Sequence, residues 1–228
     1  MARTPRNIKG NIIYHVLNRA NGREKIFKKE KDYDAFLNLL KETKEKHPMR
    51  ILSFCIMPNH WHFVLYPQKD EDLAKFMRYL THTHTQRYHA HYKTTGYGHV
   101  YQGRYKSFPV EQDNHFLQLC RYVERNPLRA GLVERAQDWK YSSLYIRKYG
   151  TKEQKTLLSR WPVQKTKNYL SWVNALQKDE EEKLKYIRHS IQKGKPFGND
   201  SWIKTIAKKL NISSTLRERG RPKKGPFK

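Results

Sequence analysis

The sequence is short of acidic residues and of long apolar runs. Its 228 residues include 47 Lys and Arg but only 21 Asp and Glu, which gives a formal net charge of +26 at pH 7. So much positive charge repels itself within a lone globule, and it indicates a polyanionic partner, above all nucleic acid. A membrane surface is the competing polyanion. The chain has no run of 18 apolar residues and no basic amphipathic helix of membrane type, so we expect no membrane partner.

Cysteine is nearly absent. Cys55 and Cys120 both lie within apolar patterns, so they are expected to be buried thiols in a reducing compartment. There is no Cys-x-x-Cys framework for zinc. The first residues are basic without an apolar stretch, which is not the pattern of a secretory signal. These features predict a cytoplasmic protein that contacts DNA or RNA.

Hydrophobic periodicity predicts alternating strands and helices in the first half of the chain. Period-two patterns predict strands, and apolar residues three and four apart predict helices. The expected strands are 11–18, 50–57, 60–66 and 100–110, and the expected helices are 30–46, 71–92 and 113–126. The order β-α-β-β-α-β is the ferredoxin-like arrangement. It is an α+β fold in which the helices cover one face of an antiparallel sheet.

The chain is expected to divide into two parts, a domain over residues 1–135 and a basic helical extension over 136–228. Short helices are predicted over 169–191 and 201–210 of the extension. The extension ends in a cationic tail that includes Arg217, Arg219 and Arg221. Its Arg-Gly-Arg-Pro core is similar to segments that place Arg in narrow minor grooves. The alternative for this motif is a solvated tail; the extension as a whole is expected to contact DNA.

Two histidines follow a predicted turn at the start of one strand. Pro58-Asn59 favours a tight turn, and side chains alternate along the strand after it. His60 and His62 therefore share one face, while Trp61 and Phe63 share the other. Two imidazoles about 7 Å apart along a strand face can converge on one metal ion. The pair is a candidate metal site.

Two further His-x-His pairs lack this geometry. His82/His84 and His89/His91 fall in a predicted helix, where residues two apart point in nearly opposite directions. These four histidines are expected to face solvent or phosphate.

One tyrosine stands four residues before an amide within a predicted helix. Among 15 tyrosines, Tyr122 alone combines a helical position with a metal-capable side chain, Asn126, at i+4 on the same face. Arg129 would extend this stripe if the helix continued, but Pro127 is expected to end it. The alternative is that Tyr122 is a half-buried aromatic residue and Asn126 a helix-ending residue.

Together these residues resemble the single-tyrosine HUH transposases, and more closely the REP-associated tyrosine transposases. The resemblance covers nearly the whole chain. The matching segments are Tyr14-His15-Val16 with Arg19, Met57 to His62, Gln102 to Ser107, Arg121 to Val133, Pro196 to Gly198 and Arg219 to Pro222. A His-x-His pair alone is weak evidence for this resemblance, but the pair followed by Tyr-x-x-x-Asn-Pro on the expected elements is specific evidence. The wider group has Gln at the place of Asn126, whose amide oxygen stands on a stem one methylene shorter.

The resemblance implies a DNA strand transferase of the bacterial cytoplasm and nucleoid. His60, His62 and Asn126 would hold a divalent ion, Mg²⁺ or Mn²⁺. Tyr122 would attack phosphorus in single-stranded DNA beside a hairpin and form a 5′-phosphotyrosine. Because the covalent link keeps the phosphodiester energy, no nucleotide cofactor is expected. The residues expected to contact DNA are Arg19, Arg104, Lys106, Arg129, Arg217, Arg219 and Arg221.

Two other functions stay open. In a metal-dependent nuclease, water would attack the phosphate and Tyr122 would be structural. In a non-catalytic binder such as an RNA-recognition sheet, a basic and aromatic signature would lie on a central strand, and residues 60–66 do not supply it. The sequence also leaves the oligomeric state open.

Overall fold

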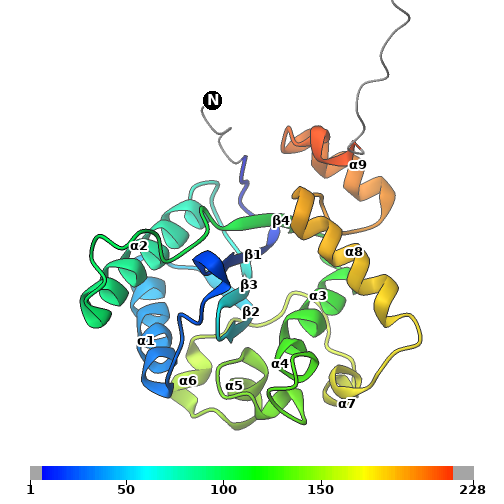
Figure 1. Ribbon diagram of the computed structural model, residues 1–228. Helices are drawn as coiled ribbons and strands as arrows, with labels where there is room; N and C mark the ends of the chain where they lie inside the picture. Colours follow the sequence, from blue (N-terminus) through cyan, green and yellow to red (C-terminus); the bar gives the residue numbers. More distant parts are fainter. Residues whose placement is uncertain (1–6, 218–228) are drawn as a thin grey trace, which may run out of the picture.

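A four-stranded antiparallel sheet organises residues 7–217, the part of the chain that the computed structural model describes. The strands are β1 (Ile13–Arg19), β2 (Arg50–Met57), β3 (His60–Tyr66) and β4 (Lys106–Val110), and their spatial order is β2-β3-β1-β4. Two helices complete the pattern, α1 (Glu30–Lys46) after β1 and α2 (Asp72–Tyr92) after β3. This is the ferredoxin-like arrangement within an α+β fold, as the sequence predicts (Figure 1).

The first face of the sheet is covered by α1 and α2. Trp61, Phe63 and Leu65 of β3 are fully buried in one cluster with apolar residues of both helices, such as Phe36 and Phe76. Burial of aromatic side chains of this size is the main source of stability for such a layer. The predicted alternation of β3 is therefore confirmed, and it leaves His60 and His62 on the opposite face.

The second face is covered by helices that follow β4 in the chain. These are α3 (Asn114–Glu124) and α8 (Glu180–Lys193), which lie together across the sheet from α1 and α2 (Figure 1). Val64 of β3 is buried in a second cluster with residues of both, including Leu119 and Leu184. The helices of the βαββαβ unit thus cover one face, and the additional helices close the other.

The extension also covers both edges of the sheet. At the β2 edge, Ile56 N donates to Tyr141 O at 2.9 Å, and Ser159 N donates to Ile51 O at 2.8 Å. At the β4 edge, Phe197 N donates to Pro109 O at 2.9 Å. Edge strands present unpaired backbone groups that can recruit other chains, so this cover satisfies those groups internally. The predicted boundary at residue 135 therefore falls between two parts that share one sheet.

The fourth strand is shorter than predicted. Leu17 pairs with Lys106, and Ala20, just after β1, pairs with Tyr101. The three residue steps from Leu17 to Ala20 are therefore matched by five steps on the neighbouring segment. The extra residues form a bulge, and the ladder of β4 begins only after it. The bulge places Gly103 beside β1, where Gly103 O accepts a hydrogen bond from Asn18 Nδ2 at 3.1 Å. The expected strand over 100–110 is therefore corrected to Lys106–Val110.

Two short elements precede the extension, η1 (Asn21–Arg23) after β1 and α4 (Asn126–Arg129) after α3. The remaining elements lie in the extension and are η2 (Ala136–Asp138), α5 (Ser143–Tyr149), α6 (Lys152–Thr156), α7 (Tyr169–Asn174), α9 (Asp200–Lys209) and η3 (Ser213–Leu216). The N-cap of α9 is Asn199, as its residue type predicts, with its side chain accepting from Trp202 N.

Cys55 and Cys120 are buried free thiols. No helix in residues 7–217 is long and apolar enough to cross a membrane.

Candidate active site

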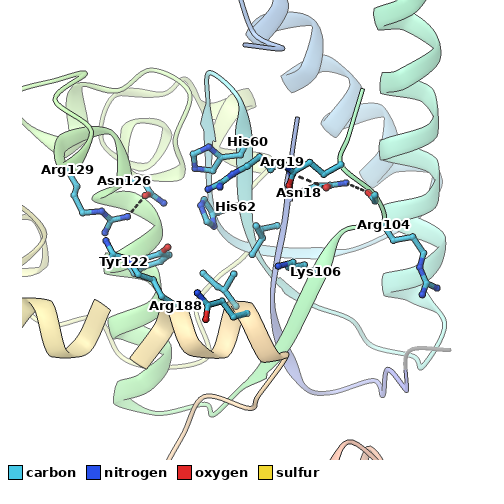
Figure 2. Close-up of a pocket in the computed structure, with 15 residues that line it drawn as sticks. Asn18, Arg19, His60, His62, Arg104, Lys106, Tyr122, Asn126, Arg129 and Arg188 are labelled. Atoms are coloured by element: carbon cyan, nitrogen blue, oxygen red, sulfur yellow. Dashed lines mark hydrogen bonds between the residues drawn. The ribbon is translucent and has the colours of Figure 1, made fainter. Parts of the chain in front are cut away.

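His60 and His62 lie at the start of β3 with their rings close together. Their ring centroids are 5.0 Å apart, and the ring planes are nearly perpendicular at 83°. The Nδ1 atom of each ring is engaged: His60 Nδ1 lies 2.6 Å from Asn59 Oδ1, and His62 Nδ1 lies 2.9 Å from His15 Nε2. The Nε2 atoms of both rings remain for a ligand. Figure 2 shows both histidines at one side of a cavity.

Both imidazoles are held neutral by their surroundings. Burial, with the charges of Arg19 and Arg129 acting in the same direction, lowers the pKa of His60 to about 4. The pKa of His62 lies well below 6.5, because burial and the neighbouring positive groups disfavour its protonated form. Neutral imidazoles are the form that binds metal ions, so the pair is ready to ligate at ordinary pH.

Tyr122 lies on α3 and faces the same cavity. Asp113 is the N-cap of this helix, with its side chain accepting from His115 N, and the buried face of the helix packs on the sheet. The Tyr122 ring is 7% exposed, and its centroid lies 5.7 Å from that of His62 at an interplanar angle of 90°. The phenol and the two imidazoles are thus on the same face of the sheet.

The helical path continues past Pro127, contrary to the expectation that this proline ends it. Pro127 stands in the first turn of α4, where a helix does not use the N–H group that proline lacks. Arg129 N donates to Arg125 O at 2.9 Å, which carries the path across the junction. Arg129 therefore reaches Tyr122, with its Cζ atom 4.7 Å from the ring centroid. Its guanidinium also donates to Asn126 Oδ1.

These side chains surround a cavity of about 600 Å³ (Figure 2). Its lining includes Tyr122, His60, His62 and Asn126, together with the predicted DNA contacts Arg19, Arg104, Lys106 and Arg129. Arg217 does not line it; the Arg217 carbonyl instead accepts from Lys193 Nζ at 3.0 Å. Arg219 and Arg221 lie outside the described residues. Eight of the eleven predicted site residues are thus brought to one cavity.

Two groups at this site have no assigned role in the sequence interpretation. Arg188, on α8, lines the cavity next to Tyr122 (Figure 2). Burial lowers the pKa of the Arg129 guanidinium, and the positive charge of Arg188 acts in the same direction. His15, on β1, is fully buried and contacts His62. A lone histidine within an apolar strand is a signal for His15, whereas nothing local to α8 singles out Arg188.

A buried ion-pair cluster fixes α8 against the tyrosine helix. Glu180 Oε2 lies 2.7 Å from Arg121 Nη2, and Glu180 Oε1 lies 3.3 Å from Arg125 Nε. The same two arginines donate to carbonyl groups at the end of α7, including Ala175 O at 2.6 Å. Guanidinium groups thereby satisfy carbonyls that the end of a helix leaves free. Removal of one partner would leave buried charge unpaired, so the placement of α8 and of Arg188 depends on this cluster.

The cavity is strongly cationic. Five of its lining residues are Arg or Lys, namely Arg19, Arg104, Lys106, Arg129 and Arg188, and none of its described lining residues is acidic. A cavity with one sign of charge concentrates ligands of the opposite sign. It therefore suits the phosphate groups of a nucleic acid.

The donors suit a divalent ion in part. His60 and His62 offer Nε2 atoms, and Asn126 offers an amide oxygen that still has a second lone pair besides the one facing Arg129. The Asn126 Nδ2 atom is buried without a partner, so the amide is held by its oxygen alone. Two imidazoles and an amide oxygen with open positions fit Mn²⁺, and they are tolerable for Mg²⁺.

A second group with possible metal geometry lies elsewhere, between β4 and α3. One potential ligand atom each from Glu111, Asp113 and His115 lie within 4.8 Å of one another. These atoms already have partners: His115 Nδ1 contacts Asp113 Oδ1 at 2.9 Å, and both Glu111 oxygens accept from Asn199. The cluster therefore serves to hold the helix start and the 197–199 segment.

The four helical histidines do not all face solvent or phosphate. His84 is buried, and its Nδ1 atom lies 2.7 Å from Tyr101 Oη. Its ring is stacked on Phe27 at 5.5 Å. The expectation is wrong for His84, because the inner side of α2 carries it into the core.

The fold and the site define an α+β protein whose sheet carries two imidazoles and an adjacent phenol in a cationic cavity. The model of the IS200-like transposases matches residues 8–126, and the chain belongs to this family. It is therefore a DNA-processing enzyme of the transposase class. A protein of Haemophilus influenzae described as a REP-associated tyrosine transposase is 27% identical over 126 residues, which cover 50% of this chain and 70% of that protein.

Two solved structures are also similar. One is a REP-associated tyrosine transposase bound to a REP hairpin, with a TM-score of 0.49 and 18% identity, covering 73% of this chain and 96% of the other. The second is a transposase of Deinococcus radiodurans, with a TM-score of 0.40 and 16% identity, covering 54% of this chain and 96% of the other.

Proposed function

We propose that this protein cleaves and rejoins single-stranded DNA beside hairpins, with Tyr122 as the nucleophile. The observation that carries the proposal is the shared cavity: the Tyr122 ring lies 5.7 Å from that of His62, among five cationic residues. A structural tyrosine would have no need of this setting. The family and the positive charge of the cavity both support DNA as the substrate.

The covalent step is an exchange at phosphorus. The oxygen of Tyr122 forms a bond to phosphorus while the bond to the 3′ oxygen breaks, and the phenol proton leaves for solvent or for the departing oxygen. The products are a 5′-phosphotyrosine and a free 3′-OH. The phosphodiester energy is kept, so the reverse attack by a 3′-OH rejoins DNA without a nucleotide cofactor.

Residues of the chain have distinct roles in this reaction. His60, His62 and Asn126 would hold Mg²⁺ or Mn²⁺, which when bound would polarise the scissile phosphate and stabilise the leaving oxygen. Arg129 orients Tyr122 by packing its guanidinium on the face of the ring, and it donates to the Asn126 oxygen. Arg19, Arg104 and Lys106 line the cavity and bind the phosphates on either side of the scissile phosphate.

The extension gives a second contribution to DNA binding. Its helix α8 supplies Arg188 to the cavity wall. The tail with Arg217, Arg219 and Arg221 also binds DNA. The unit over residues 1–135 carries the chemistry and residues 136–228 carry added affinity. The protein acts on the bacterial chromosome in the cytoplasm.

The test is a cleavage assay with a DNA hairpin that carries a single-stranded flank, labelled at the 5′ or the 3′ end, in the presence of Mn²⁺. The wild-type protein should release the 5′ fragment with a free 3′-OH and should become linked to the 3′ fragment through its 5′ phosphate. Tyr122→Phe should give neither, while Tyr97→Phe, at a tyrosine that is 87% exposed, should behave as wild type. Cutting by Tyr122→Phe at the wild-type rate would mean that water attacks the phosphate.

A further inference from the structure

His15 and His62 form a pair of buried imidazoles on adjacent strands. His15 lies on β1 and His62 on β3, and both side chains are on the face of the sheet that carries Tyr122. The distance from His15 Nε2 to His62 Nδ1 is 2.9 Å, and the ring centroids are 5.1 Å apart. His15 is fully buried, and its ring also contacts Phe108 at 4.8 Å.

The neighbouring histidine shows what such a contact does. His60 Nδ1 lies 2.6 Å from Asn59 Oδ1, and Asn59 Nδ2 donates to Arg23 O at 3.0 Å. The amide is therefore oriented with its oxygen toward the ring. An amide oxygen only accepts, so His60 carries its proton on Nδ1 and has a lone pair on Nε2. That lone pair is what a metal ion requires.

For His62 the partner is an imidazole, which can either donate or accept. If His15 Nε2–H donated, His62 would carry its proton on Nε2 and could not ligate an ion. If His62 Nδ1–H donates, its Nε2 lone pair faces the cavity. Arg19 and Arg129 line the same cavity as His62, so positive charge lies on that side of the ring. Because a lone pair that faces positive charge is favoured over an N–H that faces it, the second arrangement is the stable one.

We propose that His15 is a positioning residue: it accepts a hydrogen bond from His62 Nδ1–H and so keeps the Nε2 lone pair of His62 directed into the cavity. This inference deepens the proposed function and rests on it for its consequence in catalysis. It also accounts for an otherwise unexplained polar atom. His15 Nδ1 is buried with no hydrogen-bond partner, in a place where an apolar side chain would pack at no such cost.

The direct test places the proton in the unmodified protein. In protein labelled with ¹⁵N-histidine, the one-bond N–H coupling identifies the protonated nitrogen, and coupling across the N–H···N bond identifies its acceptor. The proposal predicts a proton on His62 Nδ1 that is coupled to His15 Nε2. A proton on His15 Nε2, or the absence of coupling between the two rings, would overturn it. Neither metal nor DNA is present, so the result is independent of whether Tyr122 cuts DNA.

The second test uses variants of His15. His15→Gln places an amide oxygen near the position of Nε2 and can still accept, whereas His15→Phe keeps a planar ring and cannot. Mn²⁺ affinity, measured by electron paramagnetic resonance on the complex of the Tyr122→Phe protein with hairpin DNA, should fall about 10- to 100-fold for His15→Phe. His15→Gln should restore most of it. Equal affinities for all three proteins would contradict the role of His15, and circular dichroism melts show which variants are folded.

Discussion

The guanidinium of Arg129 lies over the ring of Tyr122, with its Cζ atom 4.7 Å from the ring centroid, and donates to Asn126 Oδ1. One side chain thus contacts the proposed nucleophile and the proposed third ligand at once. The contact exists because the helical path continues beyond Pro127. It makes Arg129 a central element of the site.

Replacement of Arg129 should therefore impair the reaction more than the binding of DNA. Arg129→Ala removes a donor aimed at the reacting groups, and the cleavage rate at saturating DNA should fall about 100-fold. Arg129→Lys keeps the charge without the fork and should recover little of the loss. Arg135→Ala removes the same charge from an exposed position and serves as the control. A cleavage rate of Arg129→Ala within a few fold of the control would refute this role.

The contribution of α8 can be measured by salt dependence. Arg188 lines the cavity, whereas Lys185 is an exposed residue of the same helix that does not. In Arg188→Ala the slope of log K against log salt for binding of single-stranded DNA should become shallower by about one. Lys185→Ala should leave the slope unchanged. If the two variants shift the slope equally, Arg188 has no particular contact with the DNA.

Metal binding should depend on the DNA. None of the described residues that line the cavity is acidic, and five are cationic, so a divalent ion has no anionic ligand until a phosphate enters. In the Tyr122→Phe protein, Mn²⁺ affinity should rise on the order of tenfold or more when hairpin DNA is added. Asn126→Asp supplies a carboxylate and should raise the affinity without DNA. If the Mn²⁺ affinity did not change on addition of DNA, the cationic side chains would not control metal binding at this site.

The buried His84 should make the free energy of unfolding depend on pH. Burial lowers the pKa of His84 from 6.5 to about 4, so in this pH range the unfolded chain binds a proton that the folded protein excludes. The free energy of unfolding should thus fall as the pH drops from about 6.5 to 4, by about 3 kcal/mol from this residue, and should not change on its account above 6.5. His84→Gln keeps a polar partner for Tyr101 and should reduce the loss. Urea titrations at pH 7 and pH 4.5 measure the difference between the two proteins.

Local patterns predict much of this fold. The range of α1 and the ranges of β2 and β3 agree with the predicted ones, because periodicity and the Pro58-Asn59 turn are encoded by adjacent residues. The face shared by His60 and His62 follows from the same alternation. The candidate site was likewise predictable to the extent that it rests on one strand and one helix.

Other features depend on contacts between distant segments. The bulge before β4 is set by pairing of Tyr101 with Ala20, and the position of Arg188 is set by the Glu180 cluster with Arg121 and Arg125. The hydrogen bond between His15 and His62 requires the register of β1 on β3. None of these can be inferred from spacing along the chain.

A proline in the sequence is compatible with either the end or the start of a helix, and Pro127 shows this ambiguity. Pro127 was expected to end the tyrosine helix, since proline disfavours helix in the residue before it. The structure instead uses it at the start of α4, after a turn at Arg125. Only the packing of the following turn distinguishes these outcomes.

The most direct test of the account is the identity of the residue that becomes linked to DNA. After incubation with labelled hairpin DNA and Mn²⁺, the protein is digested and the peptide that carries the label is sequenced by mass spectrometry. The account predicts a nucleotide attached through its 5′ phosphate to Tyr122 and to no other residue. Cleaved DNA with no linked peptide, or a link to a different side chain, would contradict it.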